Sequence, residues 1–200
     1  MPPSFAVTWD YLCPFARNAH EHLASALRAG ATWDVRFSFF SLAQVHVQEG
    51  QPSVWEDAEK HPGLLAGMAG IVVRDRQPER FLEAHTALFA ARHDKGLDLR
   101  ERDVVAGALD EVGIDGAAVL SEVEAGWPVE TARAEHDEAV ERWAVFGVPT
   151  FVIGERAVFI RFMHRPEGDA KLAEVTIERV LDLAEGFPEL NEYKFTKVPR

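Results

Sequence analysis

The chain has 200 residues, of which 47% are hydrophobic, enough to build one domain, or one domain with an insertion, around an ordinary core. The formal net charge of −12 argues against a nucleic-acid or an anionic membrane partner, because both require clustered lysine and arginine. The single cysteine excludes an intramolecular disulfide and a cysteine-rich metal site. With no bilayer-spanning apolar run and no secretory signal at the first residues, we expect a cytoplasmic protein.

The first predicted elements place the cysteine where a strand turns into a helix. Residues 5–8 form a short, mostly apolar run that predicts a strand. Residues 14–29 predict a helix that stops at Gly30, with Pro14 in the first turn, where a missing N–H group costs no hydrogen bond. Cys13 then faces free N–H groups and the positive end of the helix dipole, which favour the thiolate. The sequence therefore predicts a thiol pKa below the free value of about 8.5.

A second strand follows, because apolar and polar residues alternate over residues 33–40. This period of two indicates a strand with one buried face. The connection from the first strand is long enough for a crossover between parallel strands. Residues 41–62 are polar and irregular. The alternating apolar positions are Trp33, Val35, Phe37 and Phe39.

The middle of the chain predicts a block of helices. Several segments carry apolar residues at helical spacing and end at glycine or are opened by proline. On two of them a histidine shares the apolar face: His85 lies with Phe81 and Leu88, and His136 lies with Ala132. The predicted helical segments are 63–74, 78–95, 104–113, 119–126 and 128–144.

The chain then returns to strand. Residues 150–153 and 157–162 are β-rich runs around a turn containing Gly154, which predicts a hairpin. Residues 171–184 predict a closing helix, and the tail shows no strong pattern. With the helical block set aside, the order predicts a mixed sheet with Cys13 at the carboxyl end of its first strand. Ligands bind at that edge in open α/β sheets.

Two motifs make this order resemble the DsbA-like branch of the thioredoxin-fold family. Cys13-Pro14-Phe15-Ala16 is similar to its Cys-Pro-x-x segment, and the stretch Phe-Gly-Val-Pro-Thr-Phe-Val at 146–152 is similar to its cis-proline loop. The resemblance implies an α/β, thioredoxin-like fold with an inserted helical domain. Residues 1–45 and 145–200 would form the thioredoxin-like domain, and residues 46–144 the helical insertion.

Two shorter sequence segments point to one group within this branch. Residues 39–42 (Phe-Phe-Ser-Leu) and 187–190 (Phe-Pro-Glu-Leu) are most similar to cytosolic actinobacterial DsbA-like proteins, which include mycothiol-dependent reductases. One departure matters: the Cys-x-x-Cys of the family is Cys-x-x-Ala here, so Ala16 cannot resolve a mixed disulfide. One-thiol chemistry remains, in which Cys13 forms a mixed disulfide and an external thiol resolves it.

The resemblance thus implies a thiol-dependent oxidoreductase, with mycothiol or glutathione as a low-molecular-weight thiol co-substrate and no metal. A glutathione-type transferase or isomerase of the kappa-like branch is one alternative, and a non-catalytic thiol-binding protein is another, since fold does not fix function. The expected partners are a small-molecule thiol and a disulfide or electrophilic substrate, with no nucleic acid and no membrane. A homodimer is left open.

The candidate catalytic residues are Cys13 and Pro149, the latter because the resemblance implies a Val148–Pro149 cis bond beside the thiol. Arg17 and His20 share the helical face of Cys13, and three aromatic residues flank it in sequence. Each has an alternative as a core or solvated side chain. The candidate substrate-binding residues are Pro14, Phe15, Val148, Trp9, Tyr11, Arg17 and His20.

Two further groups of residues were considered as possible ligand or metal sites. Arg161, His164 and Arg165 form a local basic cluster, which is either a site for an anionic thiol or a solvated loop. His20 and His22 lack the spacing of a helical metal pair, so we expect no metal site.

Overall fold

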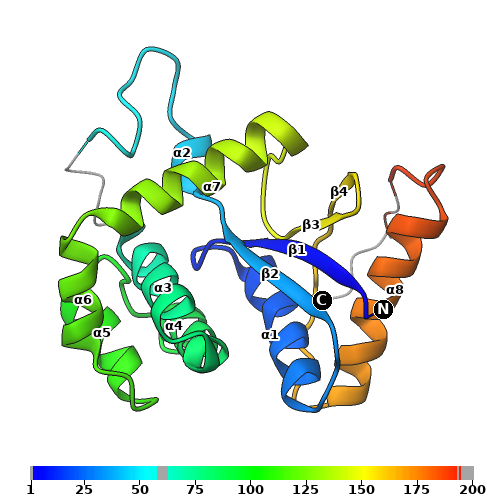
Figure 1. Ribbon diagram of the computed structural model, residues 1–200, viewed down its shortest axis with the longest axis horizontal. Coiled ribbons are helices and arrows are strands. Elements are labelled where there is room, and N and C mark those ends of the chain that lie inside the picture. Colours follow the sequence, from blue (N-terminus) through cyan, green and yellow to red (C-terminus); the bar gives the residue numbers. More distant parts are fainter. Residues whose placement is uncertain (1, 58–62, 193, 195–200) are drawn as a thin grey trace.

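Figure 1 shows the computed structural model of the chain, which describes residues 2–57, 63–192 and 194. The described residues form a sheet in which β1 is parallel to β2 and antiparallel to β3, while β3 and β4 form an antiparallel hairpin. The sheet order is β2-β1-β3-β4, which confirms the predicted mixed sheet. The strands are β1 (Ser4–Trp9), β2 (Asp34–Phe39), β3 (Thr150–Ile153) and β4 (Arg156–Phe159).

Two helices pack along the sheet and enclose the smaller of two core clusters. Helix α1 (Pro14–Arg28) makes the crossover from β1 to β2, and α8 (Ala170–Gly186) closes the chain beside it. Apolar residues of both helices meet apolar strand residues in this cluster. The cluster includes Phe5, Leu23, Phe151, Phe162 and Ile177.

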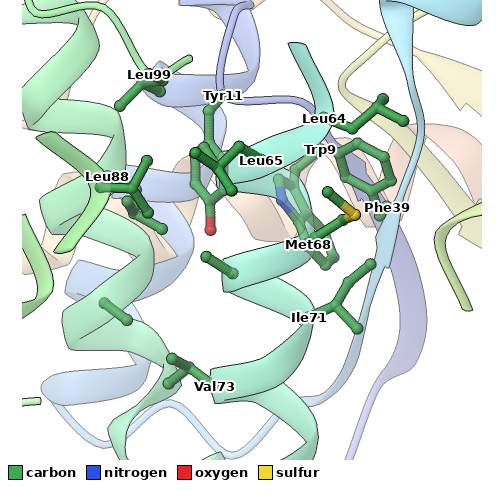
Figure 2. Close-up of a cluster of buried hydrophobic side chains, with 14 of the residues drawn as sticks. Trp9, Tyr11, Phe39, Leu64, Leu65, Met68, Ile71, Val73, Leu88 and Leu99 are labelled. Atoms are coloured by element: carbon green, nitrogen blue, oxygen red, sulfur yellow. The ribbon is translucent and has the colours of Figure 1, made fainter. Parts of the chain in front are cut away.

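Along the chain, the helical region comes between β2 and β3. In space it covers the end of β1 that leads to the cysteine (Figure 1). Figure 2 shows Trp9 and Tyr11 packed among apolar side chains of this region. The larger core cluster therefore includes residues from both parts of the fold. The elements here are α2 (Leu42–Val45), α3 (Leu65–Arg76), η2 (Pro78–Arg80), α4 (Phe81–His93), α5 (Arg102–Asp110), α6 (Gly116–Glu124) and α7 (Trp127–Trp143).

The divisions at residues 45/46 and 144/145 stay a prediction. They separate segments that differ in secondary structure, yet both sides contribute to one continuous core. Close packing of α3 explains how the core is shared. A Cβ atom at Gly70 would lie 2.5 Å from the Tyr11 hydroxyl oxygen, so only glycine lets α3 come this near to the cysteine loop.

Two local expectations differ from the structure. Within the stretch predicted to be irregular, residues 42–45 form a short helix because the Ser41 hydroxyl accepts the Gln44 N–H at 3.1 Å. Strand β4 ends at Phe159 rather than at residue 162, since its partner strand begins at Thr150, and the preceding Pro149 has no N–H to donate. Parts of the irregular stretch (58–62) and of the tail (195–200) lie outside the described residues.

Candidate active site

The geometry of Cys13 follows from its place at the start of a helix. Cys13 is the N-cap of α1, with φ −95° and ψ 117°, and its sulfur accepts the backbone N–H of Ala16 at 3.4 Å. Pro14 occupies the first helical turn, as predicted. The sulfur thus takes the place that a serine or aspartate oxygen usually has at a helix N-terminus.

The loop before β3 brings a backbone carbonyl to the thiol. The Val148–Pro149 bond is cis, and the Cys13 thiol donates to the Val148 carbonyl oxygen at 3.2 Å. The Thr150 N–H donates to the Thr8 hydroxyl at 2.9 Å, which fixes this loop to the end of β1. Both the predicted cis bond and the predicted approach of Val148 to Cys13 are confirmed.

The predicted acidic thiol is wrong for this structure. Burial raises the pKa of the Cys13 thiol above its ordinary value, because only 7% of the residue is exposed. The N–H groups of Ala16 and Phe15 lower this pKa, the nearby Asp10 raises it, and Arg161 lowers it, but burial has the largest effect. The helix terminus lowers the pKa of the thiol as expected, but desolvation by burial raises it by more.

The raised pKa predicts how the reaction rate of the thiol depends on pH. Alkylation by iodoacetamide should follow the thiolate, so its rate should rise with pH and reach half its maximum above the midpoint of a free thiol such as N-acetylcysteine. The loss of free thiol, measured by intact mass, gives the rate, with N-acetylcysteine in the same buffers as the reference. A midpoint below that reference would show that helix-terminal N–H groups outweigh burial.

Asp10 is a site residue that the sequence reasoning missed. Its carboxylate accepts the N–H of Leu12 at 2.9 Å and that of Leu42 at 2.8 Å, which ties the cysteine turn to the start of α2. Its own carbonyl accepts the N–H of Cys13 at 3.1 Å. Burial raises the pKa of Asp10 to about 6, although both N–H bonds oppose this. The available signal was a carboxylate inside the apolar stretch 9–12.

The aromatic candidates divide into core and surface. Trp9 is 0% and Tyr11 2% exposed, so both belong to the core and neither lines an open substrate site, which selects the core alternative. Phe15 is half-buried and lies under the guanidinium of Arg161, 5.6 Å from ring centre to Cζ. Pro14 is exposed beside the thiol.

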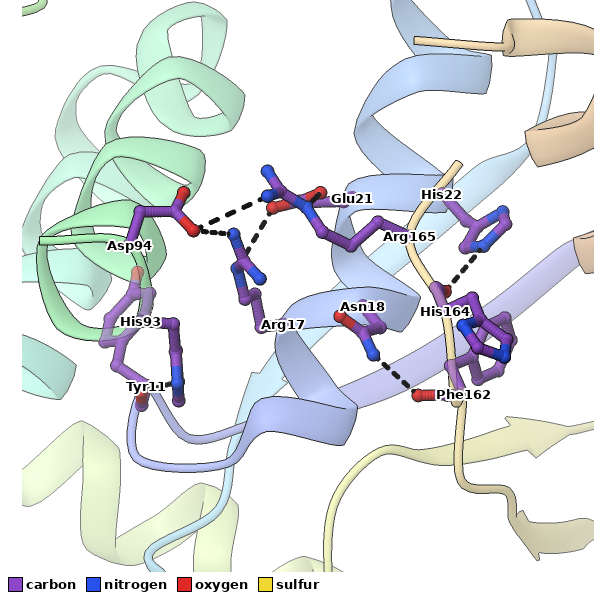
Figure 3. A network of polar contacts seen from close by, with 10 residues as sticks. All are labelled: Tyr11, Arg17, Asn18, Glu21, His22, His93, Asp94, Phe162, His164 and Arg165. Carbon is purple, nitrogen blue, oxygen red and sulfur yellow. Dashed lines mark hydrogen bonds and ion pairs between the residues drawn. The ribbon is translucent and has the colours of Figure 1, made fainter. Parts of the chain in front are cut away.

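Arg17 does not serve the thiol. Figure 3 shows Arg17 ion-paired with Glu21 and Asp94, and Arg165 bonded to the same two carboxylates. This network joins α1, the residue after α4 and the segment after β4. Arg17 is thus part of a structural clamp, and the charge of Arg165 is neutralised, so the predicted basic cluster does not form as a unit. Of that cluster, Arg161 lies close enough to lower the pKa of Cys13.

His20 belongs to a buried hydrogen-bond chain formed by Thr8, His20, His85 and Tyr11. The Thr8 carbonyl can only accept, so His20 Nε2 donates to it at 3.1 Å. Burial lowers the pKa of His20 to about 4, and it lowers that of His85 still more clearly below its ordinary value. Both rings are therefore neutral, and His20 Nδ1 accepts from His85 Nε2 at 2.9 Å. The Tyr11 hydroxyl in turn donates to His85 Nδ1 at 2.8 Å.

This hydrogen-bond chain corrects the predicted substrate-binding role of His20 and selects its alternative, a packed core histidine. Both ring nitrogens of His20 are engaged inside the protein, so its side chain faces the core and not a substrate. His85, which the pattern placed on a buried helix face, is its hydrogen-bond partner. Among the described residues, no three His, Cys, Asp or Glu side chains gather closely enough to hold a metal ion. No described helix has the length and apolar character to cross a membrane.

A mixed sheet, an N-capping thiol and a cis-proline loop against that thiol define a thioredoxin-like protein with a helical insertion. The DSBA-like thioredoxin domain family matches residues 7–164, and the chain belongs to this family. A comparison with curated protein sequences gives no significant match.

Solved structures show the same fold at low identity. The cytosolic disulfide reductase DsbM from Pseudomonas aeruginosa, solved with GSH, is 16% identical, with a TM-score of 0.61 over 90% of this chain and all of that one. Reduced DsbA1 from Neisseria meningitidis is 17% identical, with a TM-score of 0.58 over 90% of this chain and 85% of that one. A 2-hydroxychromene-2-carboxylate isomerase is 16% identical, with a TM-score of 0.61 over 90% and 96% of the two chains.

Proposed function

We propose that the protein is a thiol-dependent oxidoreductase that works through Cys13 alone, with mycothiol or glutathione as the second thiol. The observation that carries this proposal is the contact of the Cys13 thiol with Val148, next to cis-Pro149, at the N-terminus of α1. Ala16 occupies the position one helical turn on, and it supplies no second thiol. A reducing compartment such as the cytoplasm suits this mechanism, because a small thiol must be abundant.

The chemistry needs one thiol in the protein and one in solution. The Cys13 thiolate attacks one sulfur of a disulfide, the Cys13–S–S–R bond forms, and the other half leaves as R–S⁻. A second small thiolate then attacks the mixed disulfide and releases Cys13, with no net change in the protein. When the sulfur has lost its proton, the Val148 carbonyl is free to accept an N–H from an extended substrate, as in strand addition.

A second candidate is a transferase or isomerase in which Cys13 orients a bound thiol and does not attack. The raised pKa of Cys13 favours this reading, because a protonated thiol can donate a hydrogen bond to a bound thiolate. The similarity in fold to a 2-hydroxychromene-2-carboxylate isomerase agrees with it. A thiol-binding protein without catalysis is the third reading.

Intact mass after exposure to a disulfide separates these readings. Wild type, incubated with glutathione disulfide or mycothiol disulfide, should gain one adduct, and Cys13→Ser should gain none. The adduct should clear when the matching reduced thiol is added, at a rate that increases with its concentration. Activity that survives in Cys13→Ser would favour the orienting role. An absence of both adduct and thiol binding would leave the proposal without support.

A further inference from the structure

We propose that Arg161 forms an anion-binding subsite beside Cys13, which selects a small thiol or disulfide that carries a carboxylate over a neutral one. This inference rests on the proposed function and concerns which thiol the site takes. A glutathione-type thiol has carboxylates, whereas a mycothiol-type thiol, built on sugar and amide groups, has no charge. The subsite would therefore decide between the two classes.

The first observation is that Arg161 lacks the partners that its counterparts have. In an acidic protein, arginines readily find carboxylates. Within the part of the chain that the structure describes, Arg161 is the one arginine with neither a hydrogen bond nor an ion pair. The others bond to carboxylates, hydroxyls or backbone carbonyls; they are Arg17, Arg28, Arg36, Arg74, Arg76, Arg80, Arg92, Arg100, Arg102, Arg133, Arg142, Arg156, Arg165 and Arg179.

The second observation is that two aromatic rings hold this guanidinium in place. Its Cζ atom lies 5.6 Å from the ring centre of Phe15 and 5.9 Å from that of Phe159. Such contacts use the faces of the rings and leave N–H groups of the guanidinium available to a carboxylate. Arg161 is exposed, so a ligand can reach it. The group is thus oriented without being neutralised.

The third observation connects Arg161 to the reacting atom. Its charge acts on Cys13 directly, and Phe15 lies two residues after the thiol in the same helix turn. The second ring that contacts Arg161, Phe159, packs against Phe146 with the two ring centres 5.0 Å apart. Phe146 is 68% exposed. Among the described residues, the surroundings of the thiol therefore offer apolar rings and one arginine without an ion pair. A small molecule with a thiol, a compact body and one carboxylate matches that arrangement.

The experiment compares two disulfides that differ in one feature. N-acetylcysteine disulfide carries a carboxylate on each half, and N-acetylcysteinamide disulfide is neutral with the same S–S bond and almost the same size. The rate of adduct formation on Cys13, followed by intact mass, gives a ratio of anionic to neutral reagent. Because any change in thiol pKa affects both reagents equally, it cancels in this ratio.

The ratio for Arg161→Gln should be lower than for wild type by about threefold, as expected for one exposed ion pair. Arg161→Lys keeps the charge and should recover part of the difference. Added salt should reduce the wild-type ratio towards that of Arg161→Gln, because it screens exposed charges. Arg100→Gln is the matched control: it removes one positive charge from the helical region, where Arg100 pairs with Asp98, and should leave the ratio unchanged.

The outcomes separate the subsite from the function. If both disulfides modify wild type but Arg161→Gln has the wild-type ratio, the subsite is refuted while the one-thiol chemistry stands. An equal fall in Arg100→Gln would also refute it, since net charge alone would then explain the effect. If neither disulfide modifies Cys13, the proposed function fails, and the inference fails with it.

Discussion

Ala16→Cys is expected to give the protein an internal route out of its mixed disulfide. The Ala16 N–H already donates to the Cys13 sulfur at 3.4 Å. Residue 16, one helical turn along the chain, is therefore close to the thiol in space. An internal thiol acts at a high effective concentration, which should shorten the adduct lifetime by on the order of a hundredfold or more. The variant should also form an intramolecular disulfide on oxidation. Adduct lifetime by intact mass, without added thiol, measures the difference.

Ala16→Ser is the matched control, since it adds one side-chain atom, as cysteine does, but no thiol that could attack the disulfide. Ala16 is fully buried, so the melting temperatures of both variants should be compared with wild type before the kinetics are read. In wild type and Ala16→Ser the adduct should persist until external thiol is added. Clearance of the wild-type adduct without any thiol would contradict the one-thiol mechanism.

His85→Phe is expected to cost about 3 kcal/mol in the free energy of unfolding. The ring of His85 is fully buried among aromatic side chains, so phenylalanine replaces it with little change in volume. The change leaves the Tyr11 hydroxyl and His20 Nδ1 without their partners. Each buried group that loses its hydrogen bond costs about 1–3 kcal/mol. Urea unfolding, with the m-value checked, gives the comparison.

Two further variants test whether hydrogen bonding is the cause. Adding Tyr11→Phe to His85→Phe removes one orphaned hydroxyl, so the double variant should be more stable than His85→Phe alone by about 1 kcal/mol. His46→Phe, at an exposed histidine whose ring bonds to Leu42 in its own turn, should change stability by less than about 0.5 kcal/mol. If the double variant is instead less stable than His85→Phe, packing and not the hydrogen-bond chain stabilises this region.

The sequence by itself determined the elements that local chemistry controls. Alternation over residues 33–40 predicted β2, and helical spacing with glycine or proline at an end predicted α4 and α7, because side-chain periodicity reports which face is buried. Helix α1 was predicted from Pro14 in its first turn and the stop at Gly30. Cys13 was placed correctly at a helix N-terminus because capping involves only the next few residues. Pro149 and its cis bond followed from a resemblance carried by a short motif.

Only the tertiary structure decided what surrounds those residues. Burial raised the pKa of Cys13, and burial depends on helices far along the chain that the helix dipole argument ignores. His20 and His85 are 65 residues apart, so no spacing rule pairs them. Arg165 is neutralised and Arg161 is not, because folding brings Glu21 and Asp94 to one of them and aromatic rings to the other. Contacts between residues far apart in the sequence thus give two nearby arginines different environments.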